Sequence, residues 1–367
     1  MNKNQITDQF TSQLIVEKQR KNRVTNAQIT NTMILSAISL AFVNESCKSS
    51  GEISKSQVIY RKIDDVSKEI IQQCFQKNTL KFLKALKIFS RNRKFIVSFD
   101  STKEAFYGDF SKAKEPEYLH SGSIAKESYF YYEFLTVAIT GNVCQKFILD
   151  GIIMRRGIYI SDWVSEIVKW IKEKIPLEVI LFDRGFTSKE LIYELNQLKV
   201  PYMIFWRKQG EWYKSHFNEL KNGDVKIVKR KDKFYRERYC YEVNLSFVFI
   251  KQLNYDNKTF DWIFATNLNF KKAGDYVKRY KKRWGIETIY RVTDKIRIYT
   301  TSTKSIVRYF LFMFTCFVYN IWRYFQMLIS EDFTLANFKI NMIIYLTKTG
   351  KIYPVHYDDF EKIASGI

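Results

Sequence analysis

The chain has 367 residues, of which 46% are hydrophobic, while Gly (13) and Pro (4) are scarce. This composition supports a sizeable buried core and excludes wholesale disorder, low-complexity linkers and collagen-like tracts. Lys and Arg total 60 against 38 Asp and Glu, which gives a formal net charge of +22. Such an excess indicates a polyanionic partner, and nucleic acid is favoured over an anionic membrane surface, although charge alone does not separate the two.

Neither a secretory signal nor a zinc site is expected. The first ten residues, MNKNQITDQF, lack the apolar core of a signal peptide. The three histidines are dispersed, and the five cysteines form no CxxC pair: Cys47, Cys74, Cys144, Cys240 and Cys316. We therefore expect reduced thiols in a cytoplasmic protein.

Residues 306–329 form the most apolar stretch of the chain. Only 14 residues separate Arg308 from Arg323 within it, and they include Thr315 and Asn320. A membrane-spanning helix needs about 20 apolar residues. We therefore predict a buried core helix and no membrane partner.

The pattern of apolar residues changes at about residue 90. Residues 1–90 read as helical, and the stretch 52–63 contains a basic helix with Ser54 as its predicted N-cap. This helix is either the second helix of a helix-turn-helix or an ordinary amphipathic helix of a bundle. Strands and helices then alternate. Strands are predicted at 93–102, 129–140, 143–154, 177–185 and 202–206, and helices at 161–175, with Ser161 as N-cap, and 188–199.

Strands joined by helices indicate parallel pairing in part of the sheet. Residues 207–260 are rich in charged and β-forming residues and read as an inserted set of antiparallel strands. A strand at 261–268, a helix at 272–296, the apolar helix and a tail from 331 follow. Within the insertion, 225–238 is either a ribbon that contacts DNA or a solvated hairpin.

Three acids stand out as candidate metal ligands. Asp100 and Asp183 end predicted strands, where open α/β sheets place their chemistry, and Glu287 lies in the basic stretch RYKKRWGIET. In a continuous helix, Glu287 shares one face with Tyr280, Arg283, Arg291 and Asp294. Carboxylate oxygens suit Mg²⁺ or Mn²⁺, and two such ions can drive the in-line displacement of a phosphodiester. Each acid alone has an ordinary role as a cap or salt-bridge partner, but their conjunction with the net charge favours a nucleic-acid enzyme.

The three segments FIVSFDSTKEAFYGD, VILFDRGFTSKELI and YKKRWGIETIYR resemble the acidic motifs of DDE transposases from prokaryotic, in particular archaeal, insertion sequences. The family signature is Tyr, two residues, Arg, three residues, Glu, six residues, Lys, and Tyr280, Arg283 and Glu287 match it. The resemblance spans roughly residues 93–325. One position departs from the signature, because Asp294 stands where the family has Lys and Lys295 follows it.

The resemblance implies an α/β fold with an RNase H-like catalytic core, a mixed sheet flanked by helices. The expected layout is an N-terminal helical domain (1–90) as a candidate for DNA binding, the first part of the core (91–206), a β-rich insertion (207–260), the second part of the core (261–330) and a C-terminal tail (331–367). Asp100, Asp183 and Glu287 would bind two Mg²⁺ or Mn²⁺ ions.

The resemblance also implies the reaction and the partners. The reaction would be cleavage at element ends followed by strand transfer into target DNA. The expected partner is double-stranded DNA, bound by a homodimer in the cytoplasm at the nucleoid. Expected DNA contacts are Tyr280, Arg283, Arg184, Trp284, Arg291 and Lys295. Two alternatives stay open: an RNase H-type nuclease that cuts without joining, and a non-catalytic or repurposed DNA-binding protein.

Overall fold

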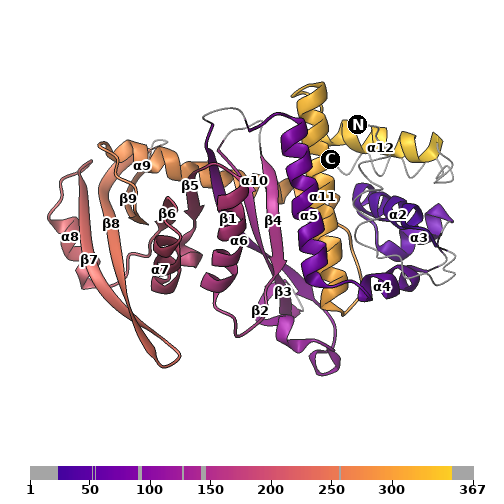
Figure 1. The fold of residues 1–367 in the computed structure, drawn as a ribbon, viewed down its shortest axis with the longest axis horizontal. Coiled ribbons are helices and arrows are strands. Elements are labelled where there is room, and N and C mark those ends of the chain that lie inside the picture. The colour runs from indigo at the N-terminus through magenta and orange to yellow at the C-terminus, as the bar shows by residue number, and fades with distance from the viewer. Residues whose placement is uncertain are drawn as a thin grey trace.

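The computed structural model describes residues 24–51, 53, 55–89, 93–125, 128–141, 146–255 and 258–348. The predictions for residues 1–23 and 349–367, and those on Ser54 and Cys144, lie outside these residues. Within them, a mixed sheet is flanked by helices, as predicted. Figure 1 shows β7 and β8 at one end of the molecule, and the helices α2, α3 and α4 at the other.

One sheet runs through the described part of the chain, in the order β2-β3-β1-β5-β6-β9-β8-β7, with β4 paired to β3. The β1–β5 and β5–β6 pairs are parallel, and the other pairs are antiparallel. Helix α7 connects β5 to β6, whereas the chain between β1 and β5 passes through β2, β3, β4 and α6. The strands are β1 Phe95–Phe106, β2 Leu119–Ala125, β3 Ser128–Ile139, β4 Phe147–Ile153, β5 Leu177–Phe182, β6 Tyr202–Phe205, β7 Val225–Arg236, β8 Tyr239–Tyr255 and β9 Lys258–Thr266.

Helices account for most of the remaining described residues. They are α2 Asn26–Ser39, α3 Val43–Ser50, α4 Ser56–Asp64, α5 Lys68–Ala85, α6 Ile160–Lys174, α7 Lys189–Gln197, α8 Glu211–Asn218, α9 Ala273–Tyr280, α10 Trp284–Thr293, α11 Ser305–Ile329 and α12 Leu335–Lys348. The predicted strands of the insertion, β7 and β8, continue the same sheet through β9 and do not form a separate one.

Several local predictions need correction. The helix α8 lies where only strands were expected. The predicted helix 272–296 is two helices, because a 3₁₀ turn at Lys281–Arg283 tightens the backbone between α9 and α10. Helix α6 begins after Tyr159, so the predicted cap Ser161 lies inside it, and Lys55 is the N-cap of α4 in place of Ser54. Local residue preference therefore found these elements but misplaced their ends.

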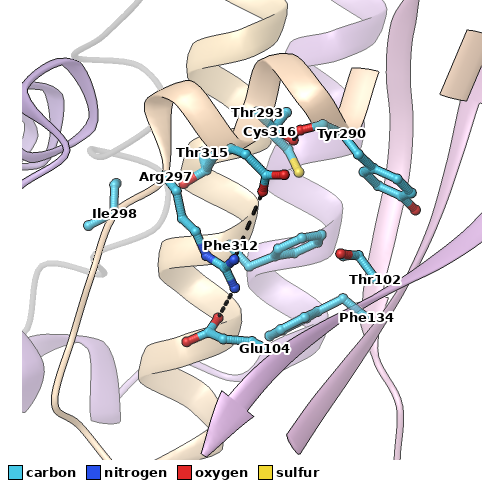
Figure 2. A pocket seen from close by; sticks show the side chains of 11 residues that line it. Thr102, Glu104, Phe134, Tyr290, Thr293, Arg297, Ile298, Phe312, Thr315 and Cys316 are labelled. Carbon is cyan, nitrogen blue, oxygen red and sulfur yellow. Dashed lines mark hydrogen bonds and ion pairs between the residues drawn. The ribbon is translucent and has the colours of Figure 1, made fainter. Parts of the chain in front are cut away.

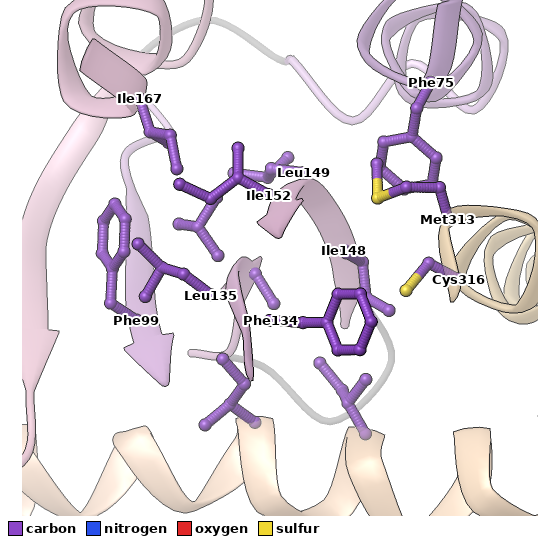
Figure 3. Packing of buried hydrophobic residues seen from close by; sticks show 14 of the residues in the cluster. Phe75, Phe99, Phe134, Leu135, Ile148, Leu149, Ile152, Ile167, Met313 and Cys316 are labelled. Atoms are coloured by element: carbon purple, nitrogen blue, oxygen red, sulfur yellow. The ribbon is translucent and has the colours of Figure 1, made fainter. Parts of the chain in front are cut away.

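The two faces of the sheet are covered by different elements. On β1, Ile96 packs with residues of α9 such as Tyr276, whereas Phe99 belongs to the main core. In that core Phe99 lies near Leu135 of β3 and Ile167 of α6 (Figure 3). Because successive side chains of a strand point to opposite faces, Asp100 shares the α9 face with Ile96. Asp100 therefore lies on the face opposite α6.

The apolar helix α11 is a core helix. By length and composition it could cross a membrane, but 89% of its most apolar stretch is buried inside the protein. Asn320, in its middle, donates to the oxygen of Ile148 (2.8 Å) and accepts from the nitrogen of Ile148 (3.0 Å). These bonds satisfy a buried amide by pairing it with the backbone of β4. The helix is thus fixed to β4, the strand that pairs with β3.

Candidate active site

Asp100 lies inside a strand and does not end one. β1 continues to Phe106, beyond the predicted strand 93–102, so the prediction that Asp100 lies at a strand end is wrong. The parallel pairing of β1 with β5 does stop just before it, at Ser98 and Leu181. Beyond that point β1 pairs only with β3, which leaves the side chain of Asp100 next to the open end of β5.

Asp183 directly follows β5, as predicted, and is held by its own loop. Gly185 donates its backbone N–H to Oδ1 of Asp183 at 2.7 Å. A Cβ at Gly185 would lie 2.8 Å from the same oxygen, so a larger residue would push the carboxylate away. Asp100 and Asp183 each lie two residues beyond the paired Ser98 and Leu181. Neighbouring strands are about 5 Å apart, so the two aspartates are close neighbours.

Glu287 reaches the aspartates because α10 docks tightly on the end of β3. A Cβ at Gly285 would lie 2.8 Å from Cβ of Thr140 and 2.9 Å from its carbonyl oxygen. Gly285 is therefore needed where the helix meets another backbone, which explains a glycine inside a helix. This contact sets the position of Glu287, which lies half a turn later.

Arg283 links the acids from the two sides. Its Nη1 lies 3.4 Å from Oδ2 of Asp100, and its Nη2 donates to Oε1 of Glu287. The side chain is only 9% exposed. Among the residues that the structure describes, no three His, Cys, Asp or Glu side chains stand ready to hold a metal ion. The guanidinium lies instead between two of the three acids.

The electrostatics of Asp100 indicate an unsatisfied need for positive charge. Burial raises its pKa to about 6, and Asp183 and Glu287 raise it as well, while Arg283 opposes the shift. Two neighbouring carboxylates therefore act on Asp100 at once. Carboxylate oxygens are the ligands that Mg²⁺ and Mn²⁺ prefer. By the chemistry of its donors the cluster fits a divalent cation, once Arg283 moves aside.

Tyr290 was not predicted as part of the site. Its hydroxyl donates to the backbone oxygen of Asp100 at 3.0 Å and also bonds Thr136 of β3. The ring borders a small cavity of about 30 Å³ behind α10, where Arg297 extends toward Asp294 and Glu104 (Figure 2). The spacing of Tyr290, three residues after Glu287 and so on a neighbouring side of α10, is the signal that could have revealed it.

The predicted DNA contacts differ in exposure. Tyr280 is 5% exposed and packs on Phe205, Trp262 and Phe264, and its hydroxyl lies near Arg283, which partly opposes the rise of the Tyr280 pKa that burial causes. Trp284 is 53% exposed, with the ammonium of Lys281 4.5 Å from its ring centre. Tyr280 therefore supports the site from the core, while Trp284 faces solvent.

Three further predicted contacts carry positive charge. Arg184 is exposed beside Asp183, with its guanidinium 5.2 Å from the ring centre of Phe205. Arg291 is exposed one turn after Glu287. Burial lowers the pKa of Lys339 of α12, and the charge of Lys295 lowers it further. Lys295 is therefore close to Lys339. Lys295 thus lies near α12, and Asp294 pairs with Arg297 at 3.9 Å.

Sequence reasoning missed a group of cations around Lys146, although it named one member, Arg291, as a DNA contact. Burial lowers the pKa of Lys146, and Arg323, Arg291 and Lys282 lower it further. These four side chains come from distant parts of the chain, so no sequence motif joins them. Like charges repel unless an anion lies among them, and the group is therefore suited to phosphate.

The fold and the site together define a basic α/β protein with an acidic cluster suited to metal-dependent phosphodiester chemistry. Residues 161–321 match the family model described as "Transposase DDE domain". This segment contains Asp183 and Glu287 and begins after Asp100. No curated protein matches the chain.

Solved structures give a second comparison. The piggyBac transposase in a synaptic complex with hairpin DNA is similar over 98% of this chain and 81% of that one, with a TM-score of 0.54 and 12% identity. The Mos1 transposase in a paired-end complex matches 52% of this chain and 60% of that one, with 11% identity and a TM-score of 0.20, too low to bear on the fold. The family match supports DNA transposase function, by an enzyme that acts on DNA through the DDE mechanism, and the fold is similar to that of the piggyBac transposase.

Proposed function

We propose that this chain is the transposase of a prokaryotic, in particular archaeal, insertion sequence. Asp100, Asp183 and Glu287 would together hold two Mg²⁺ or Mn²⁺ ions. The observation that supports the proposal best is the convergence of three acids that are distant in sequence. Arg283 contacts both Asp100 and Glu287, and Asp183 follows the strand next to that of Asp100 at the same level. When bound, the ions would activate the attacking oxygen and stabilise the leaving oxygen of the phosphodiester.

The surrounding residues hold the DNA and the acids. Arg184, Trp284 and Arg291 are exposed next to the acids and would contact the DNA strand to be cut. Arg283 would leave the carboxylates for a DNA phosphate, and Tyr280 would position Arg283 through its hydroxyl. Lys295, beside Lys339, would meet only a duplex that extends to α12.

The finer organisation belongs to the same proposal. The core would be RNase H-like and formed by 91–206 and 261–330, with 207–260 as an insertion and the helices before residue 90 as a DNA-binding domain. The tail would be 331–367. The protein would act as a homodimer on paired element ends in the cytoplasm, at the nucleoid, and would transfer the cut ends into target DNA. The net charge of +22 is consistent with this partner.

A nicking assay on supercoiled DNA carrying the element ends tests the catalytic claim. With Mg²⁺ or Mn²⁺, the wild type should nick the DNA, and D183N and E287Q should lower the rate at least about 100-fold, since even outer partners of metal ligands cost 10- to 100-fold. D109N is a matched control, because Asp109 is exposed and caps its own turn through Ser111. Metal-dependent nicking that survives in D183N would overturn the assignment.

A second assay separates the alternatives. A pre-cut end with a free 3′-hydroxyl should be joined to target DNA by the wild type. Cutting without joining would favour an RNase H-type nuclease. DNA binding with neither activity would favour a repurposed protein, for which Asp294 at the position of the signature Lys is the supporting observation.

A further inference from the structure

The outward face of the β7–β8 ribbon carries a row of three lysines. Lys229, Lys231 and Lys233, here called the lysine row, alternate along β7 and are exposed, and Tyr235 continues the row at 75% exposed. Alternate residues of a strand are about 7 Å apart on one face. Glu242 on β8 faces Lys233 at 3.8 Å, so Lys229 and Lys231 carry most of the unbalanced charge.

The opposite face of β7 is anchored to the body of the protein. Asp232, the one acid of β7, points inward and bonds Lys189 of α7 and Arg230, and these partners outweigh burial and lower its pKa to about 2. Arg236 pairs with Asp162 of α6 at 2.7 Å, and Phe234 is 7% exposed. The ribbon therefore presents its cations from a fixed support, with its acid turned away.

The lysine row lies on the sheet face that carries the candidate acids. Lys229 pairs with Ser246 of β8, and Val248, two residues further, packs in the cluster that contains Tyr280 and Ile96. Asp100 shares that face with Ile96. Five strand steps separate β1 from β7, which is about 24 Å at 4.8 Å per step. A duplex rises 3.4 Å per base pair, so roughly 7 base pairs separate the two places.

We propose that the lysine row binds the phosphate backbone of duplex DNA about 7 or more base pairs from the position held at the acids. The inference rests on the proposed function, because both places would hold one DNA molecule. The charge complementarity, the spacing and the shared face all favour DNA over an acidic protein or a membrane. The row adds affinity without reading sequence, since it contacts only phosphates.

The test compares the wild type with the triple variant K229Q/K231Q/K233Q. Each protein is titrated into a 40-base-pair duplex at several salt concentrations, and fluorescence anisotropy measures the affinity. In a plot of the logarithm of affinity against the logarithm of salt concentration, the slope for the triple variant should be smaller in magnitude than that for the wild type by about 2 to 3. Its affinity near 0.15 M salt should be lower on the order of 10- to 100-fold. K169Q/K174Q is the control, because these exposed lysines lie on α6, on the opposite face. It should keep a slope close to that of the wild type.

Two results would overturn the inference. One is that the triple variant binds DNA with the same salt slope as the wild type. This result counts against the inference even if the variant no longer binds anionic lipid vesicles. The other is an equal loss in the control, which would make the effect one of net charge alone. If the wild type binds DNA and D183N abolishes nicking while the triple variant binds normally, this inference fails and the proposed function stands. If the wild type neither binds nor nicks DNA, the proposed function fails.

Discussion

The guanidinium of Arg283 lies 3.4 Å from the carboxylate of Asp100. The same side chain donates to Glu287, so one buried cation balances two acids. Among the described residues, no three His, Cys, Asp or Glu side chains are arranged to hold a metal ion. A divalent cation would compete with the guanidinium for the same oxygens. DNA phosphate offers Arg283 another partner, so substrate and metal would be coupled through this residue.

Replacing Arg283 with Gln should raise the affinity of the free protein for Mn²⁺ by about tenfold, or about 1.4 kcal/mol, because the competing charge is removed. Without metal, the same variant should melt at a lower temperature, since Asp100 loses its cation in a largely buried site. Titration calorimetry and thermal unfolding with and without Mn²⁺ measure both effects. R283K keeps the charge and should stay near the wild type, and equal Mn²⁺ affinities in all three proteins would refute the competition.

A methyl group at Gly285 should displace α10 from β3. Gly285→Ala places a Cβ within 3 Å of Thr140, so we expect a loss of about 1–3 kcal/mol in stability and slower nicking, because Glu287 shifts with the helix. Gly274→Ala is the control. It lies in α9 with open space around it, and it should gain up to about 1 kcal/mol from helix propensity. Similar stability changes in both variants, by denaturant unfolding, would argue against the contact.

Asp150 should make the stability of the protein depend on pH. It is fully buried on β4 and accepts hydrogen bonds from Gln72 (2.8 Å) and Gln76 (2.7 Å) of α5, and burial raises its pKa from 3.8 to about 7. The folded state therefore holds a proton that the unfolded state has lost, between about pH 4 and pH 7. Stability from this group is present at low pH and is lost as pH rises toward 7.

Asp150→Asn removes this titration. The unfolding free energy of the wild type relative to that of D150N should increase as pH falls from 7 to 5, by up to about 1.4 kcal/mol per pH unit. The difference between the two melting temperatures should increase with it. Other groups titrate alike in both proteins, so the difference isolates Asp150. A difference that is constant across this range would show that the carboxyl stays charged in the folded protein.

Asp294 and Lys295 can be tested as a pair. Asp294→Lys should steepen the slope of the logarithm of DNA affinity against the logarithm of salt concentration by about 1, because it places a cation where the signature has one. It gives up only an ion pair to Arg297 in which Asp294 is 67% exposed, worth about 0–1 kcal/mol. Lys295→Gln should leave the salt dependence of DNA binding unchanged, since Lys295 lies near Lys339 of α12. A weaker slope in K295Q would place the DNA contact on Lys295 after all.

The sequence by itself determined the elements that depend on local periodicity. The strands near 95, 129 and 177, the helices near 161 and 189 and the buried helix α11 follow from apolar spacing, and Asp183 follows its strand as predicted. The three acids were proposed from type, position and resemblance. These features are local because hydrophobic period and turn chemistry act over a few residues.

Only the tertiary structure decided how distant segments meet. Three features of the site depend on pairs of residues that are mostly more than 40 positions apart. They are the place of Arg283 between the acids, the contact of Gly285 with Thr140 and the group of cations around Lys146. The 3₁₀ turn between α9 and α10 directly follows Tyr280, which packs in the buried cluster with Ile96 and Tyr276. Packing and electrostatics act through space, so a single sequence does not fix them until the chain has folded.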